Sequence, residues 1–234
     1  MAQVMKRPGN FLQKRGTWYL VATIASLLAA AILALAFHPL AGLAPLPLLV
    51  SAASRYARYV KGLTGERQVG EALAALDDSY YVVHDAKIPR ANIDHIVLGP
   101  NGVFVLETKN FSGRVTCYHD RWWVARRGSG SRGRQIRSPG HQANTNATKV
   151  RQRIREFERT LLKGFPRVQW VHAVVVLPHP EVEVIVNSPG VPVLRVGELV
   201  AHIRAAPLPA KLPAALLTKI GFALMGMAPG EQLG

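Results

Sequence analysis

Two neighbouring apolar segments in the middle of the chain, residues 93–98 and 103–109, are separated by the turn sequence Gly99-Pro100-Asn101-Gly102. Apolar runs of this length, joined by a turn rich in Gly, Pro and Asn, are typical of a β-hairpin. Similar short runs predict further strands at residues 80–83, 114–117, 122–124, 170–177 and 191–196, with a weaker candidate at 182–186. The chain is therefore expected to contain a β-sheet.

Helical spacing of apolar residues appears on both sides of these strands. Between residues 143 and 161 apolar side chains recur at alternating spacings of four and three. Ser138-Pro139 fits the start of this helix, with Ser as N-cap and Pro in the first helical position. A helix is also predicted over residues 63–76, with Thr64 as its cap, and shorter helices at 198–204 and 213–227. This order of elements predicts a mixed α/β domain.

An uncharged apolar run, residues 18–37, is 20 residues long, which is about the length of a helix that crosses a bilayer core. We expect it to be a membrane anchor; a cleaved signal peptide is the alternative, but the run is long for one. A second apolar segment, residues 40–53, is shorter. It reaches a similar length if the next basic side chains extend to the membrane interface: Arg55, Arg58 and Lys61.

One or two membrane passes are compatible with this pattern. Basic residues flank the outer ends of both apolar segments: Lys6, Arg7, Lys14 and Arg15 before the first, and Arg55, Arg58 and Lys61 after the second. Because basic flanks prefer the cytoplasm, a helical hairpin with both ends in the cytoplasm is favoured. We therefore expect the chain in a cell membrane, the bacterial inner membrane, with its globular domain facing the cytoplasm.

Composition supports a folded and basic protein. The chain has 29 basic and 14 acidic residues, a formal net charge of +15, and 49% apolar residues. The apolar fraction excludes a disordered chain, and the single cysteine, Cys117, excludes an internal disulfide framework. Residues 1–54 carry four basic residues and no acid, which leaves 25 basic and 14 acidic residues in the remainder. A globular part this basic suggests nucleic acid or an anionic membrane surface as partner; a basic surface without a partner is the alternative.

These patterns divide the chain into five expected regions. Residues 1–17 form a basic cytoplasmic N-terminus, and residues 18–54 contain the transmembrane segments. Residues 55–62 form a linker to the main domain, residues 63–206. Residues 207–234 form a C-terminal helical extension.

The predicted hairpin carries two acids that repel one another. If the loop is Gly99 to Gly102, Leu98 opposes Val103 and, counting back, Asp94 opposes Glu107. Directly opposed residues have Cβ atoms about 5 Å apart, and like charges there destabilise a sheet. A divalent metal would resolve the conflict, because Mg²⁺ takes one or two carboxylates together with water and phosphate oxygens. Lys109 lies on the same face, so a cross-strand salt bridge of this lysine with both acids is an equal alternative.

The helix before the strands carries another acid, Glu66, which extends the apolar stripe formed by Val69, Leu73 and Leu76. An acid at such a position is explained either by its place in the first helical turn or by a role in a site. The nearby histidines His95, His119 and His141 are treated as packed or surface residues. Trp122 and Trp123 are expected in the core rather than stacked on bases.

Taken in order, these elements resemble the NERD family of nuclease-related domains, within the PD-(D/E)XK nuclease superfamily. The resemblance covers residues 62–177. It is carried by Gly65-Glu66, Ile93-Asp94-His95, the segment from Gly99 to Val105, Glu107-Thr108-Lys109-Asn110, Gly113 and Gln142. The resemblance implies a restriction-endonuclease-like α/β core, a central mixed β-sheet flanked by helices, which here follows an N-terminal transmembrane anchor.

The resemblance also implies roles for individual residues. Asp94 and Glu107 would bind Mg²⁺ or Mn²⁺, Lys109 would be the lysine of the E-x-K element, and Glu66 would face the site from the first helix. Gln142 would support the site near the scissile phosphate. The implied reaction is metal-assisted hydrolysis of a phosphodiester, of DNA in preference to RNA. Arginines and a lysine in the basic loop 126–137 and on the long helix are the expected nucleic-acid contacts: Arg126, Arg127, Arg132, Arg134, Arg137, Lys149 and Arg153.

Two other functions remain open from the sequence. One is a membrane-tethered nucleic-acid-binding or interaction module that keeps the fold without turnover, since fold does not prove activity. The other is a structural membrane protein whose basic face meets anionic lipid. The complete set of two acids and a lysine favours the nuclease.

Overall fold

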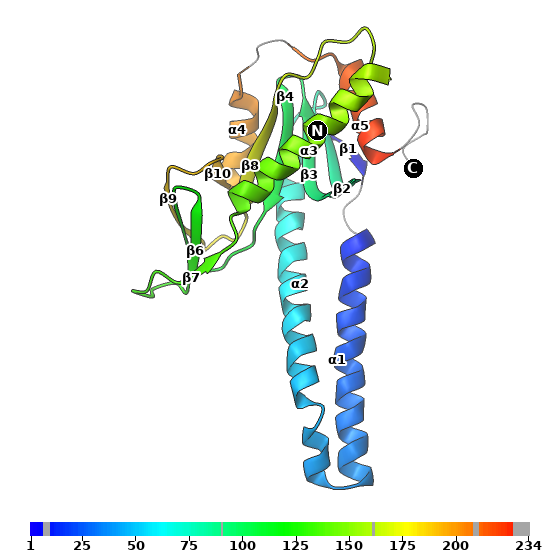
Figure 1. Cartoon of the computed structure of the whole chain (residues 1–234), viewed down its shortest axis with the longest axis vertical. Coiled ribbons are helices and arrows are strands. Elements are labelled where there is room, and N and C mark those ends of the chain that lie inside the picture. Colours follow the sequence, from blue (N-terminus) through cyan, green and yellow to red (C-terminus); the bar gives the residue numbers. More distant parts are fainter. Residues whose placement is uncertain (7–9, 90, 161, 208–210, 227–234) are drawn as a thin grey trace. The chain divides into compact units, whose positions relative to one another are not determined.

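The computed structural model describes residues 1–6, 10–89, 91–160, 162–207 and 211–226 (Figure 1). The chain divides into two compact units. The helical unit comprises residues 9–64, and the globular unit comprises residues 1–8 together with 65–234. The globular unit is thus assembled from both sides of the helical unit in the sequence.

The helical unit is a pair of helices joined by a short turn. It contains α1 (Asn10–Ala36), the 3-10 turn η1 (Pro39–Leu43) and the first part of α2 (Leu46–Leu73). The ring of Tyr59 lies against Gly16, and Ala34 lies against Gly42, so the two helices run antiparallel. Within the described residues, one segment is long and apolar enough to cross a membrane, the 21 residues Gly16–Ala36 of α1.

The segment that follows is part of one continuous helix. Residues 55–62, expected as a linker, are helical and belong to α2. Thr64 does not cap a helix, because it lies inside α2 and its hydroxyl donates to the carbonyl of Val60 at 3.0 Å. The segment contains no proline, so the helix passes through this region without a break.

The globular unit is built on a six-stranded mixed sheet with the order β1-β2-β3-β4-β8-β10. Its strands are β1 (Gln3–Lys6), β2 (Tyr81–Ile88), β3 (Ala91–Gly99), β4 (Gly102–Thr108), β8 (Val171–Leu177) and β10 (Val193–Arg195). β2, β3 and β4 are antiparallel neighbours, while β4–β8, β8–β10 and β1–β2 pair in parallel. The sequence predicts only a basic terminus for residues 1–17, and β1 is an additional element.

Helices cover both faces of this sheet, as the α/β interpretation requires. One face packs against α3 (Pro139–Thr160) and α5 (Ala214–Met225), which bury residues such as Val150 and Ile220. The other face packs against residues 65–73 of α2 and against α4 (Leu199–Ala205), which follows the turn η2 (Val196–Glu198). The expected C-terminal extension, residues 207–234, therefore supplies a core helix, α5, to the globular unit.

The start of α3 agrees with its sequence. The hydroxyl of Ser138 accepts a hydrogen bond from the backbone N–H of His141 at 2.8 Å, and Pro139 is the first helical residue. An N-cap of this kind satisfies a backbone donor that the helix cannot pair internally. Asp120 accepts from the Ser138 hydroxyl and from the indole N–H of Trp122, at 2.9 Å each. Trp122 is fully buried, as expected, whereas Trp123 is only partly buried.

A second sheet of four strands has the order β7-β6-β5-β9. It consists of β7 (Arg134–Ile136), β6 (Arg121–Ala125), β5 (Arg114–Tyr118) and β9 (Glu183–Asn187). His119 and Asp120 join β5 to β6 with positive φ angles of 46° and 56°, as the two-residue hairpin turns require. Residues 126–137 are not wholly a flexible loop, because they contain β7, which pairs with β6.

Candidate functional site

Acidic side chains gather at one end of the β3–β4 hairpin. Asp94 lies on β3, Glu107 on β4 and Glu66 on α2, and each acid affects the pKa of at least one other. Lys109 follows directly after β4. The fold thus assembles the acids and the lysine that the sequence singled out. We call these four residues, together with Asp85, the acid cluster.

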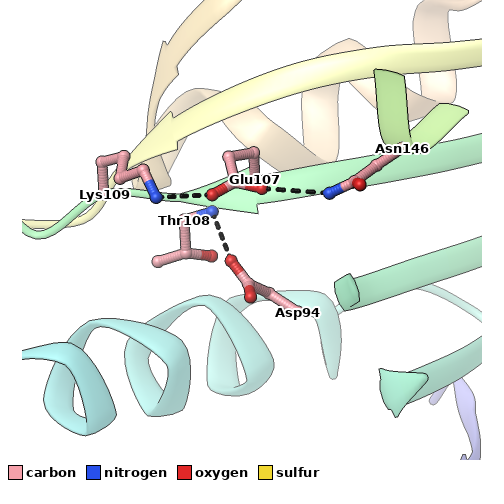
Figure 2. A network of polar contacts seen from close by, with 5 residues as sticks. All are labelled: Asp94, Glu107, Thr108, Lys109 and Asn146. Carbon is pink, nitrogen blue, oxygen red and sulfur yellow. Dashed lines mark hydrogen bonds and ion pairs between the residues drawn. The ribbon is translucent and has the colours of Figure 1, made fainter. Parts of the chain in front are cut away.

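The register of the hairpin is the predicted one. Leu98 pairs with Val103 and Ile96 pairs with Val105, and the ladder continues to His95 opposite Leu106. One step further, Asp94 and Glu107 do not form a ladder pair. The Asp94 carboxylate instead accepts a hydrogen bond from the backbone N–H of Thr108 at 2.8 Å (Figure 2). The acid on β3 is therefore fixed by the main chain of the E-x-K segment.

Glu107 is held from two sides. Its side chain is only 2% exposed, Lys109 Nζ lies 2.6 Å from Oε1, and the Asn146 amide donates to Oε2 at 3.3 Å. Figure 2 shows Lys109, Glu107 and Asn146 in one row, with Asp94 approaching Thr108. Burial, followed by the charge of Asp94, raises the pKa of Glu107 to about 7, although Lys109 and Asn146 oppose the shift. Lys109 thus pairs with Glu107, and no ion pair of Lys109 with Asp94 occurs among the described residues.

Asp94 is also destabilised as an anion. Burial raises the pKa of its carboxyl, and the charge of Asp85 acts in the same direction. The hydrogen bond from Thr108 and the charge of Lys109 lower the pKa and so oppose this shift. Two neighbouring carboxylates on adjacent strands therefore share a single nearby cation, which leaves negative charge in a buried environment.

Glu66 has no helix-end explanation. It lies about 20 residues inside α2, far from the first turn, so the helix dipole does not account for its position. Its side chain is half-buried, and burial raises the pKa of Glu66 to about 8. The charges of Asp94, Asp85 and Glu107 act in the same direction, and Lys109 opposes them. Of the two explanations for this acid, a role in the site is favoured.

The glycine before Glu66 permits this approach. A Cβ at Gly65 would lie 2.8 Å from Cβ of Asn110 and 3.1 Å from Cγ of Pro178. The backbone of α2 therefore comes close to the segments that leave β4 and β8 only because residue 65 has no side chain. This contact explains why Gly and Glu occur together at this point of the helix.

Asp85 is an acid that sequence reasoning missed. On β2, His84 pairs with His95 and Ala86 pairs with Ile93, so Asp85 lies at the level of Asp94 on the neighbouring strand. Its φ angle is +48°, in the left-handed region, and its side chain is 7% exposed. Aspartate tolerates this conformation better than most residues. No local pattern in the sequence marks Asp85, because its position depends on the pairing of β2 with β3.

Asn146 is a second missed residue. It is 6% exposed and contacts Glu107, whereas Gln142, the residue the family resemblance selected, lies one turn earlier on α3. Among the described residues, the Gln142 side chain makes no hydrogen bond to the acid cluster. The spacing of four between Gln142 and Asn146, on one face of a helix, is the signal that could have suggested Asn146.

The histidines next to the acids face each other. His84 Nδ1 and His95 Nδ1 lie 2.8 Å apart, and burial lowers the pKa of His84 to about 4 and that of His95 to about 3. Both rings are therefore neutral at physiological pH. His95 is a packed residue, as expected.

The predicted nucleic-acid contacts differ in their surroundings. Arg127 forms exposed ion pairs with Glu181 and Glu183, at 3.6 and 3.4 Å. Arg153 lies 2.7 Å from Glu156, and the guanidinium of Arg132 stacks on Trp123, 4.3 Å from the ring centre. The remaining arginines of this set are exposed, and Lys149 is partly exposed: Arg126, Arg134, Arg137 and Lys149.

The donor set at the acid cluster fits Mg²⁺ or Mn²⁺. Within the described ranges, no three His, Cys, Asp or Glu side chains converge closely enough to hold a metal by themselves. Mg²⁺ does not require such a cage, because it keeps several waters and binds through one or two carboxylates. Asp94 and Glu107 could supply these oxygens. Burial raises the pKa of both carboxyls, and the charge of a divalent cation would act in the opposite direction.

Comparison with known proteins gives the same assignment. The model of the nuclease-related domain, NERD, matches residues 61–178, which is just over half of the chain. An uncharacterized protein of Bacillus anthracis is 44% identical over 61 residues, which are 24% of this chain and 29% of that protein. The chain thus aligns with under a third of that relative's length. No solved structure matches. Because the family model covers the hairpin and all members of the acid cluster, the chain belongs to the NERD family of PD-(D/E)XK-like nuclease domains.

Proposed function

We propose that this protein is a metal-dependent nuclease that hydrolyses phosphodiester bonds of DNA and is held in a membrane by its helical unit. The observation that carries the proposal is the arrangement of Asp94, Glu107 and Lys109. Two buried carboxylates with raised pKa values stand beside one lysine at the end of a hairpin. Such a group costs stability in a domain that needs only packing, so a function accounts for it best.

Asp94 and Glu107 would hold the metal ion. A bound Mg²⁺ supplies Lewis-acid polarisation of a phosphoryl oxygen and a lowered pKa for water. The hydrogen bond from Thr108 N–H fixes the orientation of Asp94, and the Asn146 amide fixes that of Glu107. Ligands fixed in this way lose little entropy on binding, which favours an accurate geometry.

Lys109 would act on the phosphate. Its ammonium group lies 2.6 Å from Glu107, and its side chain is 31% exposed, so it can contact a ligand without leaving the acid. A cation at this point would stabilise the negative charge that develops on the phosphoryl oxygens in the transition state. Lys109 would thereby link metal binding by Glu107 to stabilisation of the reacting phosphate.

Glu66 is suited to proton transfer. A group transfers protons most effectively when its pKa lies near the operating pH, and the pKa of Glu66 is about 8 without a cation in the site. A divalent ion on Asp94 and Glu107 would lower this value towards neutrality. Glu66 would then orient the attacking water and accept its proton.

The charge of the protein supports a nucleic-acid substrate, for which we propose DNA. Residues 55–234 carry 25 basic and 14 acidic side chains. Exposed arginines on and beside the second sheet, including Arg126, Arg134 and Arg137, would contact the phosphate backbone. Contacts of this kind give affinity without reading base sequence.

The connection of the two units supports a two-pass membrane anchor. β1 lies before the helical unit and pairs with β2, which lies after it, so the chain leaves the globular unit and returns to it. If α1 crosses a bilayer, the following segment must cross it again. Gly16 lies opposite Tyr59, and Gly42 lies opposite Ala34.

The basic residues of α2 fit this arrangement. By the antiparallel pairing within the helical unit, Arg58 and Lys61 would be level with the beginning of the apolar segment of α1, near residues 14–17. Arg55 would lie about 5 Å deeper, one helical turn, within reach of the interface by snorkelling. The positive charges at this end favour a cytoplasmic position for it.

The test uses the full chain in a non-ionic detergent with supercoiled plasmid. We expect nicking with Mg²⁺ or Mn²⁺ and none in EDTA. The Lys109→Ala variant should lose at least ~100-fold in rate, because it removes a transition-state contact. Lys211→Ala, an exposed lysine outside both the acid cluster and the second sheet, is the matched control and should retain the rate. Cleavage that persists in EDTA or in Lys109→Ala would refute the proposal, and equal cleavage of RNA would refute the preference for DNA.

A further inference from the structure

A basic cleft lies on α3 and the segment that follows it, away from the acid cluster. Its volume is about 740 Å³. Five basic side chains and one tryptophan dominate its lining: Arg151, Arg155, Arg159, Lys163, Arg167 and Trp170. None of these cations belongs to the set that the sequence suggested for nucleic-acid contact.

Local geometry explains why these cations converge. Arg151, Arg155 and Arg159 are spaced by four, so they lie along one side of α3. Lys163 and Arg167 come from the segment between α3 and β8, and Trp170 directly precedes β8. The helix and the segment that turns back from it therefore form the cleft.

The positive charge of the cleft is not compensated. Glu158 is the one acid in the lining, and its carboxylate accepts the backbone N–H of Val168 at 2.9 Å. In the described part of the chain, none of the five cations forms an ion pair, and Nε of Arg151 is buried without a hydrogen-bond partner. Like charges at this density repel one another, so an anionic ligand would stabilise the arrangement.

Trp170 adds a stacking surface to the charge. It is 62% exposed, which is unusual for a tryptophan, and the guanidinium of Arg151 lies 5.7 Å from its ring centre. An exposed aromatic ring beside backbone-binding cations is the combination that binds unpaired nucleotides. A lipid surface would also meet the cations, but a concave site favours a ligand that enters it.

The cleft is separate from the acid cluster. Trp170 adjoins Val171, which pairs with Val103, whereas Glu107 pairs with Val175. Four strand residues correspond to about 13 Å. Along α3, Arg159 lies 13 residues beyond Asn146, or about 20 Å. A ligand in the cleft therefore does not occupy the place of the scissile phosphate.

We infer that this cleft binds an unpaired segment of a nucleic-acid strand, with its phosphates on the arginines and a base on Trp170. The inference deepens the proposed function and rests on it, because it assigns a place to the strand beyond the point of cleavage. It also predicts a preference for substrates that carry a single-stranded segment.

Binding is measured by fluorescence anisotropy with the full chain in non-ionic detergent, in EDTA, on a labelled 12-residue oligothymidylate and on its duplex. We expect Arg155→Ala with Arg159→Ala to weaken single-strand binding by more than ~10-fold. The slope of the logarithm of the binding constant against the logarithm of salt concentration should also become shallower, by about 1.4 for two phosphate contacts. Arg195→Ala with Arg204→Ala, two exposed arginines on β10 and α4, is the matched control and should change neither quantity by much.

Substitutions of Trp170 distinguish the contribution of base stacking to binding from that of charge. Trp170→Ala should weaken single-strand binding by roughly 5- to 150-fold, and Trp170→Phe should restore most of it, because one stacked base is worth about 1–3 kcal/mol. Neither change should affect duplex binding, in which the bases are already stacked.

The inference is wrong if the cleft variants bind the oligonucleotide with wild-type affinity and salt slope. It is also wrong if these variants lose only their retention on vesicles of phosphatidylserine, which would assign the cleft to lipid. Binding is measured without metal, so it does not depend on cleavage. A protein that binds single strands through the cleft but never cleaves would refute the proposed nuclease function and still support the cleft as a binding site.

Discussion

The carboxylate of Asp94 accepts a hydrogen bond from the backbone N–H of Thr108, the residue between Glu107 and Lys109, at 2.8 Å. One acid of the pair is therefore positioned by the main chain that carries the other acid and the lysine. A shift of β3 against β4 would break this hydrogen bond and move Asp94 away from Glu107 and Lys109. The helices α2 and α3 add Glu66 and Asn146 to this end of the hairpin.

Substitution of two helical glycines tests the close approach of α2 to the segments that follow β4 and β8. Gly65→Ala would place a Cβ 2.8 Å from Asn110, so we expect a loss of ~1–3 kcal/mol and lower cleavage, because Glu66 moves with the backbone. Gly62→Ala is the control, since a Cβ there meets nothing within 4 Å and alanine favours a helix. Thermal unfolding and cleavage rates check both. Equal melting temperatures and equal cleavage rates of the two variants would contradict a close approach of α2 at Gly65.

Asn146 is expected to matter through Glu107. Asn146→Ala removes a hydrogen bond to a buried carboxylate, an interaction worth about 1.5–3 kcal/mol when one partner is charged. Binding of Mn²⁺, measured by calorimetry, should weaken by roughly 10-fold or more. Asn144→Ala, an exposed asparagine two residues away on α3, should bind as the wild type does. If Asn146→Ala also binds as the wild type does, Glu107 does not depend on this amide.

The buried acids make stability depend on pH in the absence of metal. The pKa values of Glu66, about 8, and Glu107, about 7, lie above their ordinary value of 4.5. The folded state therefore retains protons that the unfolded state has released, and stability falls as pH rises towards 8. The lowered pKa values of His84 and His95 act in the opposite sense, but only below about pH 6.5.

The informative window is therefore pH 6.5 to 8. In EDTA we expect the melting temperature to fall by several degrees across it, and Mg²⁺ to remove most of the fall. Glu107→Gln should flatten the dependence, whereas Glu71→Gln, at an exposed site on α2, should not. A melting temperature that is constant or rises with pH in EDTA would show that the acids are not held in the protonated form.

Much of this site could be predicted from local pattern, and the reasons are physical. The register of the β3–β4 hairpin follows from the turn Gly99 to Gly102, because a short loop fixes strand pairing. The start and the buried face of α3 follow from Ser138-Pro139 and the spacing of apolar residues. The family elements brought Glu66 into the set, and the structure explains it through burial in the middle of a long helix.

What local pattern missed depends on distant contacts. β1 has four residues and pairs with a strand about 80 residues later, so no neighbouring sequence marks it. Asp85 reaches the acid cluster through the pairing of β2 with β3 and a left-handed backbone angle. Asn146 resembles any polar residue of a helix until the packing of α3 on β4 brings it to Glu107. Thr64 two residues before Glu66 resembles a helix cap in the local sequence, but the helix already continues from residue 46.

The two-pass anchor can be tested by labelling. Leu40→Cys lies in η1, between the two helices, and Ser131→Cys lies on the basic segment of the globular unit. In membrane vesicles of opposite orientation, an impermeant maleimide should label Leu40→Cys only from the outer side and Ser131→Cys only from the cytoplasmic side. Cys117 is buried and should not react in the folded protein. Labelling of both positions from the same side would exclude a hairpin that crosses the membrane.

The central claim, that Asp94 serves metal-dependent cleavage, is tested most directly by one paired measurement. Plasmid nicking in Mg²⁺ and oligonucleotide binding in EDTA are measured on the same preparations of wild type and Asp94→Asn. We expect nicking to fall by at least ~100-fold in the variant, while binding stays within about twofold, because the acid holds the metal and does not contact the DNA backbone. A variant that nicks at the wild-type rate, or a wild type that binds and never nicks, would contradict the account.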